Sequence, residues 1–163
     1  MVNLQLKSIN VTIPEGCNVI FGHTHFIKSI EDLYETLVES GIALKFGIAF
    51  CEASGQRLIR SDGNDSELTR HAEQEAMKIG AGHSFIIFIR GGFPISILNR
   101  VKMVSEVCTV YVATANPLEI VYADTSEGRA ILGISDGMRP LGIETETDKS
   151  ARKEFLRKIG YKR

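Results

Sequence analysis

Residues 45–88 hold the strongest structural signal in the chain, because two almost wholly apolar segments there flank one amphipathic helix. The segments 46–51 and 84–89 carry apolar side chains at nearly every position, which is typical of strands covered on both faces. Between them, a helix predicted at residues 66–79 places apolar side chains on one face, at Leu68, Ala72, Ala76 and Ile79. Polar and ionisable residues collect where these elements end, at 52–55, 61–65 and 80–83. This pattern predicts an α/β protein whose site lies at the ends of its strands.

The rest of the chain adds strands and helices of the same kind. Apolar or alternating segments predict strands at 4–11, 18–21, 56–60, 107–113, 118–123 and 129–134. Helical periodicity predicts further helices at 30–38 and 95–103, and a last helix from about residue 147 with Ala151, Phe155, Leu156 and Ile159 inward. The order of elements predicts one domain, residues 1–163, with a three-layer α/β/α arrangement and a mixed sheet.

Composition excludes several classes of protein. The 163 residues are 44% hydrophobic and 24% charged with a net charge of −1, which argues against disorder and against a nucleic-acid partner. No apolar run is long enough to span a membrane, and the N-terminus lacks the apolar core of a signal peptide, so we expect a cytoplasmic protein without a membrane partner. Three cysteines without a CxxC spacing argue against a disulfide framework and a zinc site.

Two positions before the first helix suggest phosphate chemistry. His25 precedes the helix start and Lys28 follows it by three residues. A helix start offers free N–H groups and partial positive charge, so an anion added to the His25 ring would meet donors and a cation. His83, which opens a strand after Gly80-Ala81-Gly82, is the alternative. The competing interpretation of either histidine is a strand-end side chain hydrogen-bonded to backbone.

Two other motifs, a His-x-His pair and a glycine-rich loop, bear on a metal site and on a Walker-type ATP site. His23 and His25 are two residues apart and would share a face on a strand, as ligands of one metal do. A hydrolase of that type needs more ligands than His71 and His83 supply, so no metal site is predicted. Residues 80–83 end a helix and lack the Lys-Ser/Thr of a P-loop, which argues against a Walker-type site.

Carboxylates stand at the ends of the central elements. Glu52 follows a buried strand, where a charge is costly unless it is paired, and Arg57 or Arg60 are its expected partners. Asp65 lies at a strand-to-helix junction where a ribose or magnesium ion could meet it, and Asn64 is the expected N-cap of the helix.

Several stretches together resemble the adenosine-specific kinase family of archaea and bacteria. They cover nearly the whole chain in register and comprise His25-Phe26-Ile27-Lys28 with Glu31-Asp32-Leu33-Tyr34, residues 45–55, Gly63-Asn64-Asp65, residues 79–85, Ala113-Thr114-Ala115-Asn116-Pro117, Asp136-Gly137 and residues 156–162. The resemblance implies a protein that binds adenosine or AMP and forms a homo-oligomer, a trimer. It also implies a phosphorylatable histidine, with His25 expected and His83 as the alternative.

The first hypothesis is a phosphotransfer protein that binds adenosine or AMP. In it, His25 takes the phosphoryl group as a neutral imidazole nucleophile, and Lys28 with the helix N-terminus stabilises that group. No cofactor is assigned, and ATP with Mg²⁺ is the candidate phosphate donor. The expected nucleoside-binding residues are Phe46, Phe50, Glu52, Asn64, Asp65, Asn116 and Asp136. Two alternatives remain open at this point: a nucleotide-binding sensor without turnover, and a metal-dependent hydrolase built on His23 and His25.

Overall fold

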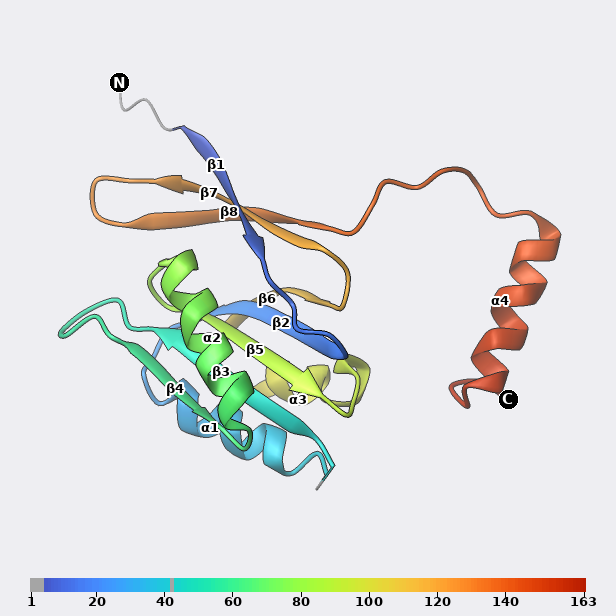
Figure 1. The fold of residues 1–163 in the computed structure, drawn as a ribbon, viewed down its shortest axis with the longest axis horizontal. Helices are drawn as coiled ribbons and strands as arrows, with labels where there is room; N and C mark the ends of the chain where they lie inside the picture. Colours follow the sequence, from blue (N-terminus) through green and yellow to red (C-terminus); the bar gives the residue numbers. More distant parts are fainter. Residues whose placement is uncertain (1–4, 42) are drawn as a thin grey trace.

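The computed structural model describes residues 5–41 and 43–163 and arranges their strands in two sheets (Figure 1). The larger sheet has the order β4-β3-β5-β2-β6, and the smaller sheet has the order β1-β7-β8. The larger sheet contains β2 (Cys17–Thr24), β3 (Lys45–Cys51), β4 (Ile59–Gly63), β5 (Ser84–Arg90) and β6 (Val107–Thr114). The smaller sheet contains β1 (Leu6–Val11), β7 (Leu118–Asp124) and β8 (Arg129–Asp136). The expected start of the first strand at residue 4 lies outside the described residues.

The α/β class is confirmed, whereas the mixed sheet is wrong, because every strand pair in the described residues is antiparallel. The β3–β4 hairpin reverses the chain before the helix that follows it, so β5 returns antiparallel to β3. Strands β2 and β3 do run in the same direction across a helical connection, but β5 lies between them. The alternation of strands and helices therefore predicted the crossover correctly and the neighbouring strands incorrectly.

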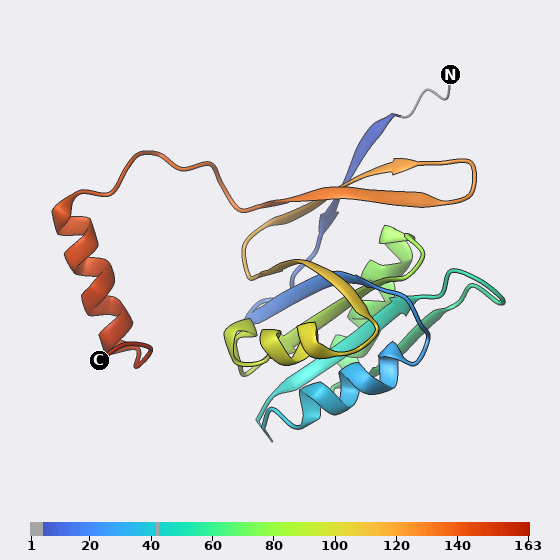
Figure 2. The same ribbon diagram turned by 180° about the vertical axis from the view of Figure 1, so that it is seen from behind.

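Helices cover both faces of the five-stranded sheet (Figures 1 and 2). Helix α2 (Ser66–Ile79) packs its apolar stripe, including Leu68 and Ala72, on one face. Helices α1 (Ser29–Val38) and α3 (Leu98–Met103) cover the other face, where Leu33 and Val101 are fully buried. The strands of this sheet are apolar on both sides because both sides are covered.

The three-stranded sheet shares the α2 face of the larger sheet. Leu118 and Ile120 of β7 are buried in the same apolar cluster as the inner face of α2. The three-layer arrangement predicted from the sequence contains a single sheet, so it does not account for this second sheet. No helix in the described part of the chain is both long and apolar enough to cross a membrane.

Several element ends differ from expectation. Helix α2 has the predicted bounds, but Asp65 is its N-cap, since its side chain accepts hydrogen bonds from the N–H groups of Glu67 and Leu68. The second strand of the hairpin lies at Ile59–Gly63 rather than 56–60. The predicted helix after Phe93 divides into a short 3-10 turn, η1 (Pro94–Ser96), and α3.

The last helix stands apart from both sheets. Helix α4 (Glu146–Lys158) begins with a capping box at Thr145 and contains no buried residue. An extended segment, residues 137–145, leads to it, and both views show it clear of the sheets. The expected inward face of this helix is wrong for the single chain, because Phe155 is 57% exposed.

Candidate functional site

Four strands of the larger sheet meet at one end, and this end brings both candidate histidines together. Here β2 and β3 finish and β5 and β6 begin. The Thr24 N–H donates to the His83 carbonyl at 2.9 Å, and the His83 N–H donates to the Cys51 carbonyl at 2.7 Å. The His25 N–H donates to the Glu106 carbonyl at 3.1 Å. We call this end of the sheet the histidine end.

His83 adopts a backbone conformation that non-glycine residues rarely take. Its φ is 61°, in the left-handed region, and the two backbone hydrogen bonds just described hold it there. Strained residues of this kind persist where surrounding structure enforces them, and they concentrate at functional sites. The half-buried His83 ring stacks on Phe50, with ring centroids 5.7 Å apart and an interplanar angle of 16°. Phe50 itself is fully buried, so its face is occupied by His83 rather than open to a base.

His23 lies beside His83 rather than beside His25. The His23 and His83 ring centroids are 6.1 Å apart, whereas the His25 residue is exposed. Burial, together with the neighbouring His83, lowers the pKa of His23 below its ordinary value. Within the described residues no three His, Cys, Asp or Glu side chains are grouped to hold a metal ion, so nothing in this geometry supports the His-x-His hydrolase.

Lys28 lies between two carboxylates, one of which the sequence reasoning missed. Its ammonium forms ion pairs with Asp32, on α1, and with Glu106, just before β6. Asp32 and Glu106 raise the pKa of Lys28, and Lys28 in turn lowers the pKa of Asp32. Lys28 is therefore a cation held in place on the turn that also carries His25.

Glu106 is 2% exposed, and apart from the Lys28 ammonium no donor in the described residues reaches its carboxylate oxygens. A buried carboxylate with so few partners is costly, which is a signature of functional sites. Its backbone carbonyl also holds His25, so one residue positions both expected phosphate-handling groups. The signal available in the sequence was a single acidic residue next to an apolar strand, which is the same signal that singled out Glu52.

The loop that carries His25 is fixed by buried hydroxyls. The Thr24 and Ser29 hydroxyl groups hydrogen-bond each other, and the Ser29 hydroxyl also donates to the Phe26 carbonyl. Thr24 and Ser29 are fully buried. These contacts tie the end of β2 to the start of α1 and leave His25 and Lys28 facing solvent on a rigid turn.

A cavity of about 530 Å³ lies at the histidine end, between the two sheets. The end of β3, the end of α2 and the β7–β8 hairpin line it, through Glu52, Gly80, Gly82 and Arg129 among others. His83 follows the lining residue Gly82 and donates its backbone N–H to the lining residue Cys51, while its ring stacks on Phe50, which packs on the α1 face of the sheet. A nucleoside-sized ligand fits a cavity of this size.

Glu52 lines this cavity, and its neighbours favour the charged carboxylate form. The Leu58 N–H donates to it at 3.1 Å and Arg60 pairs with it at 3.0 Å, as the sequence predicted for Arg60. The Leu58 N–H and then Arg60 lower the pKa of Glu52. On the opposite wall, the Arg129 guanidinium donates to the Lys78 and Ile79 carbonyls and so caps the C-terminus of α2.

The remaining expected site residues lie at the other end of the sheet. The Asn64 side chain accepts the Phe46 N–H and donates to the Leu44 carbonyl, each at 2.8 Å, and Asp65 caps α2. The Phe46 ring is fully buried under α1. A strand of seven residues, such as β3, separates these groups from Glu52 by about 20 Å.

Asn116 and Asp136 form a separate cluster near that far end. The Thr114 hydroxyl donates to the Asp136 carboxylate at 2.7 Å, and the Asn116 side chain donates to it at 3.1 Å. Thr114 pairs with Val19 near the start of β2. One chain therefore brings together His25, Lys28, His83, Phe50 and Glu52, and it keeps Phe46, Asn64, Asp65, Asn116 and Asp136 apart from them.

Comparisons with known proteins point to one family. A protein-family model described as "Adenosine specific kinase" matches residues 9–162. Among solved structures, the crystal structure of PH1918 protein from Pyrococcus horikoshii OT3 is similar, with 41% sequence identity and a TM-score of 0.94, over 99% of each chain. No match was found among the curated proteins.

Proposed function

The chain belongs to the adenosine-specific kinase family, and we propose from this premise that it binds adenosine or AMP at the histidine end and transfers a phosphoryl group there through His25. The family resemblance inferred from the sequence is confirmed over nearly the whole chain. The observation that carries the proposal is the Lys28 ammonium, held by Asp32 and the buried Glu106, on the same turn as the exposed His25, whose backbone N–H also contacts Glu106. This arrangement suits a phosphoryl group more than any neutral ligand.

The phosphate step uses the rigid turn between β2 and α1. An unprotonated ring nitrogen of His25 attacks the terminal phosphorus of ATP, an N–P bond forms, and ADP leaves. Lys28 offsets the negative charge on the transferred group, and Glu106 keeps Lys28 in position. Glu106 acts here as a positioning residue, because its carboxylate contacts Lys28 and its carbonyl contacts His25.

The nucleoside step uses the cavity between the sheets. Adenosine placed there would have its hydroxyl groups near Glu52, whose lowered pKa keeps it an acceptor at neutral pH. A hydroxyl oxygen of adenosine attacks the phosphorus, the N–P bond breaks, and Glu52 takes the hydroxyl proton as AMP forms. His83, whose backbone N–H donates to the cavity-lining Cys51, is the rival acceptor of the phosphoryl group.

We further propose that the protein works as a homo-oligomer, a trimer, as the resemblance implies. The residues Asn116 and Asp136 lie far from the histidine end in one chain, and contact between copies would be needed for them to reach a nucleotide there. In a monomer, Phe46, Asn64 and Asp65 support the fold rather than the ligand.

The test is retention of radiolabel after incubation with terminally labelled ATP, followed by transfer to adenosine. We expect the wild-type protein and His71→Ala, a matched change on α2, to label equally and His25→Ala to lose the label. Loss in His83→Ala with retention in His25→Ala would reassign the acceptor. Saturable adenosine binding by calorimetry without any label would instead identify a nucleotide sensor without turnover.

A further inference from the structure

The C-terminal arm, residues 138–163, is structurally independent of the rest of the chain. Every hydrogen bond and ion pair that these residues make within the described chain has its partner in the same segment. A helix as short as α4, with 13 residues, is only marginally stable in water without packing contacts. A well-capped helix in such an arm therefore points to a surface that covers it.

Apolar side chains on the arm indicate which face is covered. Ala151 and Phe155 on α4 and Ile159 at its C-cap recur at intervals of four residues and form one exposed stripe. Leu141 and Ile143 in the preceding segment are fully exposed as well. Large apolar side chains in such a row are typical of an interface, because a solvated helix gains nothing from them.

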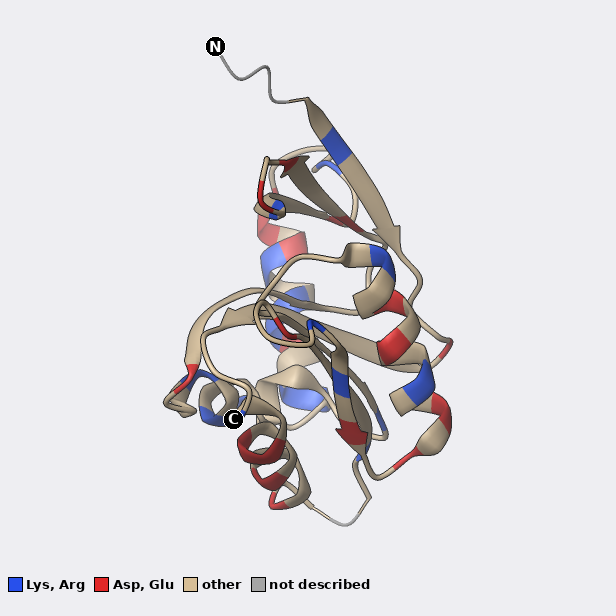
Figure 3. Ribbon diagram, turned by 90° about the vertical axis from the view of Figure 1, so that its left-hand side faces the viewer, with Lys and Arg blue, Asp and Glu red and all other residues tan. Residues whose placement is uncertain are grey.

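The charges of the arm indicate what kind of surface it fits. Helix α4 carries five basic and three acidic residues, and Lys162 and Arg163 follow it. Helix α1 carries Glu31, Asp32 and Glu35 and no basic residue between its ends. Figure 3 shows this contrast in the colours of the two helices. The two helices are also similar in length, at about 20 Å and about 15 Å.

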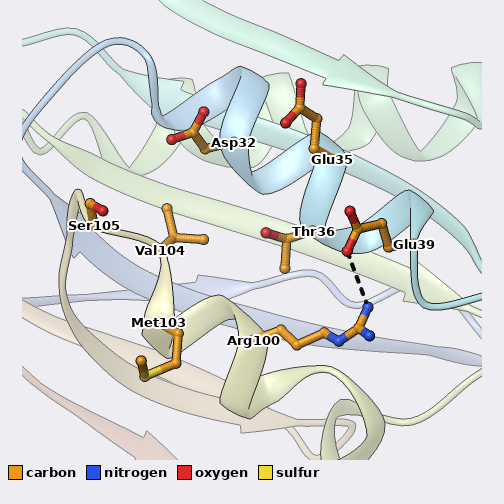
Figure 4. Close-up of a pocket in the computed structure, with 8 residues that line it drawn as sticks. All are labelled: Asp32, Glu35, Thr36, Glu39, Arg100, Met103, Val104 and Ser105. Atoms are coloured by element: carbon orange, nitrogen blue, oxygen red, sulfur yellow. Dashed lines mark ion pairs between the residues drawn. The ribbon is translucent and has the colours of Figure 1, made fainter.

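An open groove beside α1 offers the matching site. It encloses about 470 Å³ between α1 and α3 and is lined by Asp32, Glu35, Thr36, Glu39, Met103 and Val104, among others (Figure 4). Met103 is 82% exposed at its rim. Asp32 pairs with Lys28 and Glu39 with Arg100, while Glu35 forms no ion pair within the described residues. The groove thus combines an exposed apolar side chain with carboxylate charge.

We propose that the C-terminal arm of one copy docks on a second copy of this chain, with α4 lying in the groove between α1 and α3. The stripe around Phe155 packs against Met103 and Val104. The flanking Arg152, which pairs with Glu144 in the free arm, meets Glu35 in the docked one. Such a head-to-tail contact joins two different surfaces, and repeating it forms a ring when the rotation between copies closes, as the proposed trimer requires. The inference rests on the homo-oligomer proposed above, and it identifies the C-terminal arm as the segment that holds the copies together.

The docked arm would also reach the candidate site. Asp32 lines the groove and at the same time holds Lys28. The basic residues of a partner's α4 therefore lie next to the phosphate-handling turn of the copy that receives them. We expect nucleotide affinity to fall when the arm is prevented from docking.

The experiment measures the mass of the full chain in solution by size-exclusion chromatography with light scattering. We expect the wild type to be oligomeric, and Phe155→Ala with Ile159→Ala to raise the dissociation constant by about tenfold or more. The matched control is Leu6→Ala, an exposed apolar residue on β1 that should leave the mass unchanged. Thermal melting verifies folding, since the arm makes no contact that the sheets need.

Charge reversal then tests the groove. Glu35→Arg and Arg152→Glu should each weaken association, and the two changes in one chain should restore it. Association lost with the arm variants, but without this rescue, would overturn the groove as the docking site. An oligomer unaffected by the arm variants would overturn the whole inference and leave the proposed function intact. A monomeric wild type would overturn both the inference and the proposed assembly.

Discussion

The two ends of the five-stranded sheet carry similar polar residues but use them differently. At the far end, the Asn64 amide hydrogen-bonds to two backbone groups and Asp136 accepts two side-chain donors. At the histidine end, Glu106 is buried with Lys28 as its only partner among the described residues, and His83 has a strained backbone. Polar side chains at strand ends are therefore a weak indication of a site. A buried charge with few partners and a strained backbone are stronger indications of a site.

The largest effect should come from Lys28. In Lys28→Met, the phosphoryl group at the histidine end loses its cation, and we expect labelling from ATP to fall on the order of a hundredfold. The variant also leaves Glu106 buried without a counter-charge, so it should be less stable. Labelling normalised to folded protein separates these two effects.

The matched control combines Lys28→Met with Glu106→Gln, which removes both charges at once. We expect this double variant to melt near the wild-type temperature and to remain as inactive as the single variant. If labelling returned in the double variant, Lys28 would serve only to balance Glu106, and the two ends of the sheet would differ in stability rather than in function.

Glu52→Gln should show the next largest effect, and only at the histidine end. The substitution keeps the size of the side chain and removes the charge that a ribose hydroxyl would meet. We expect the dissociation constant for adenosine, measured by calorimetry, to rise about tenfold, as for one charged hydrogen bond. Unchanged affinity would show that the nucleoside does not occupy the cavity between the sheets.

The opposite result is expected at the far end. Asn64→Ala removes two hydrogen bonds to the backbone of the Leu44–Phe46 segment. We expect a loss of about 1 kcal/mol in the free energy of unfolding, measured with urea, and no change in adenosine affinity. Weaker nucleotide binding by folded Asn64→Ala would return this residue to the binding site, where the sequence had placed it.

The sequence predicted those parts of the fold that depend on local pattern. The bounds of α2 were predicted correctly because an amphipathic stripe and Gly80, which adopts a positive φ, define them locally. Strand order was not predictable in the same way, since β5 lies between β2 and β3 only through tertiary pairing. The face of α4 was recognised as apolar, but the sequence does not show that this face is left uncovered in the single chain.

Site residues follow the same rule. His25, Lys28 and Glu52 were expected in the site because each stands at an element end with a local reason for charge. Glu106 was not expected there, because its link to the candidate site is its ion pair with Lys28, which lies 78 positions earlier in the sequence. Asn64 and Asp65 were expected in the site because, in sequence, a helix cap and a ligand-binding carboxylate look alike.

The smallest effect concerns His23 and the pH dependence of stability. Its pKa is lower in the folded chain than in the unfolded chain, because burial and the neighbouring His83 disfavour the charged ring. The unfolded chain therefore binds a proton first as the pH falls, so this contribution to stability is present above about pH 6.5 and declines below it. The neighbouring strands contribute Ser84 and Thr109 opposite His23, neither of which carries a charge.

We expect the melting temperature to fall by a few degrees at most between pH 7 and pH 5, and by less in His23→Gln than in the wild type or in His71→Gln. If the melting temperature changed equally with pH in all three proteins, protonation of His23 would make no contribution to stability. The contrast between the two ends of the sheet would then depend on Glu106 and His83 alone.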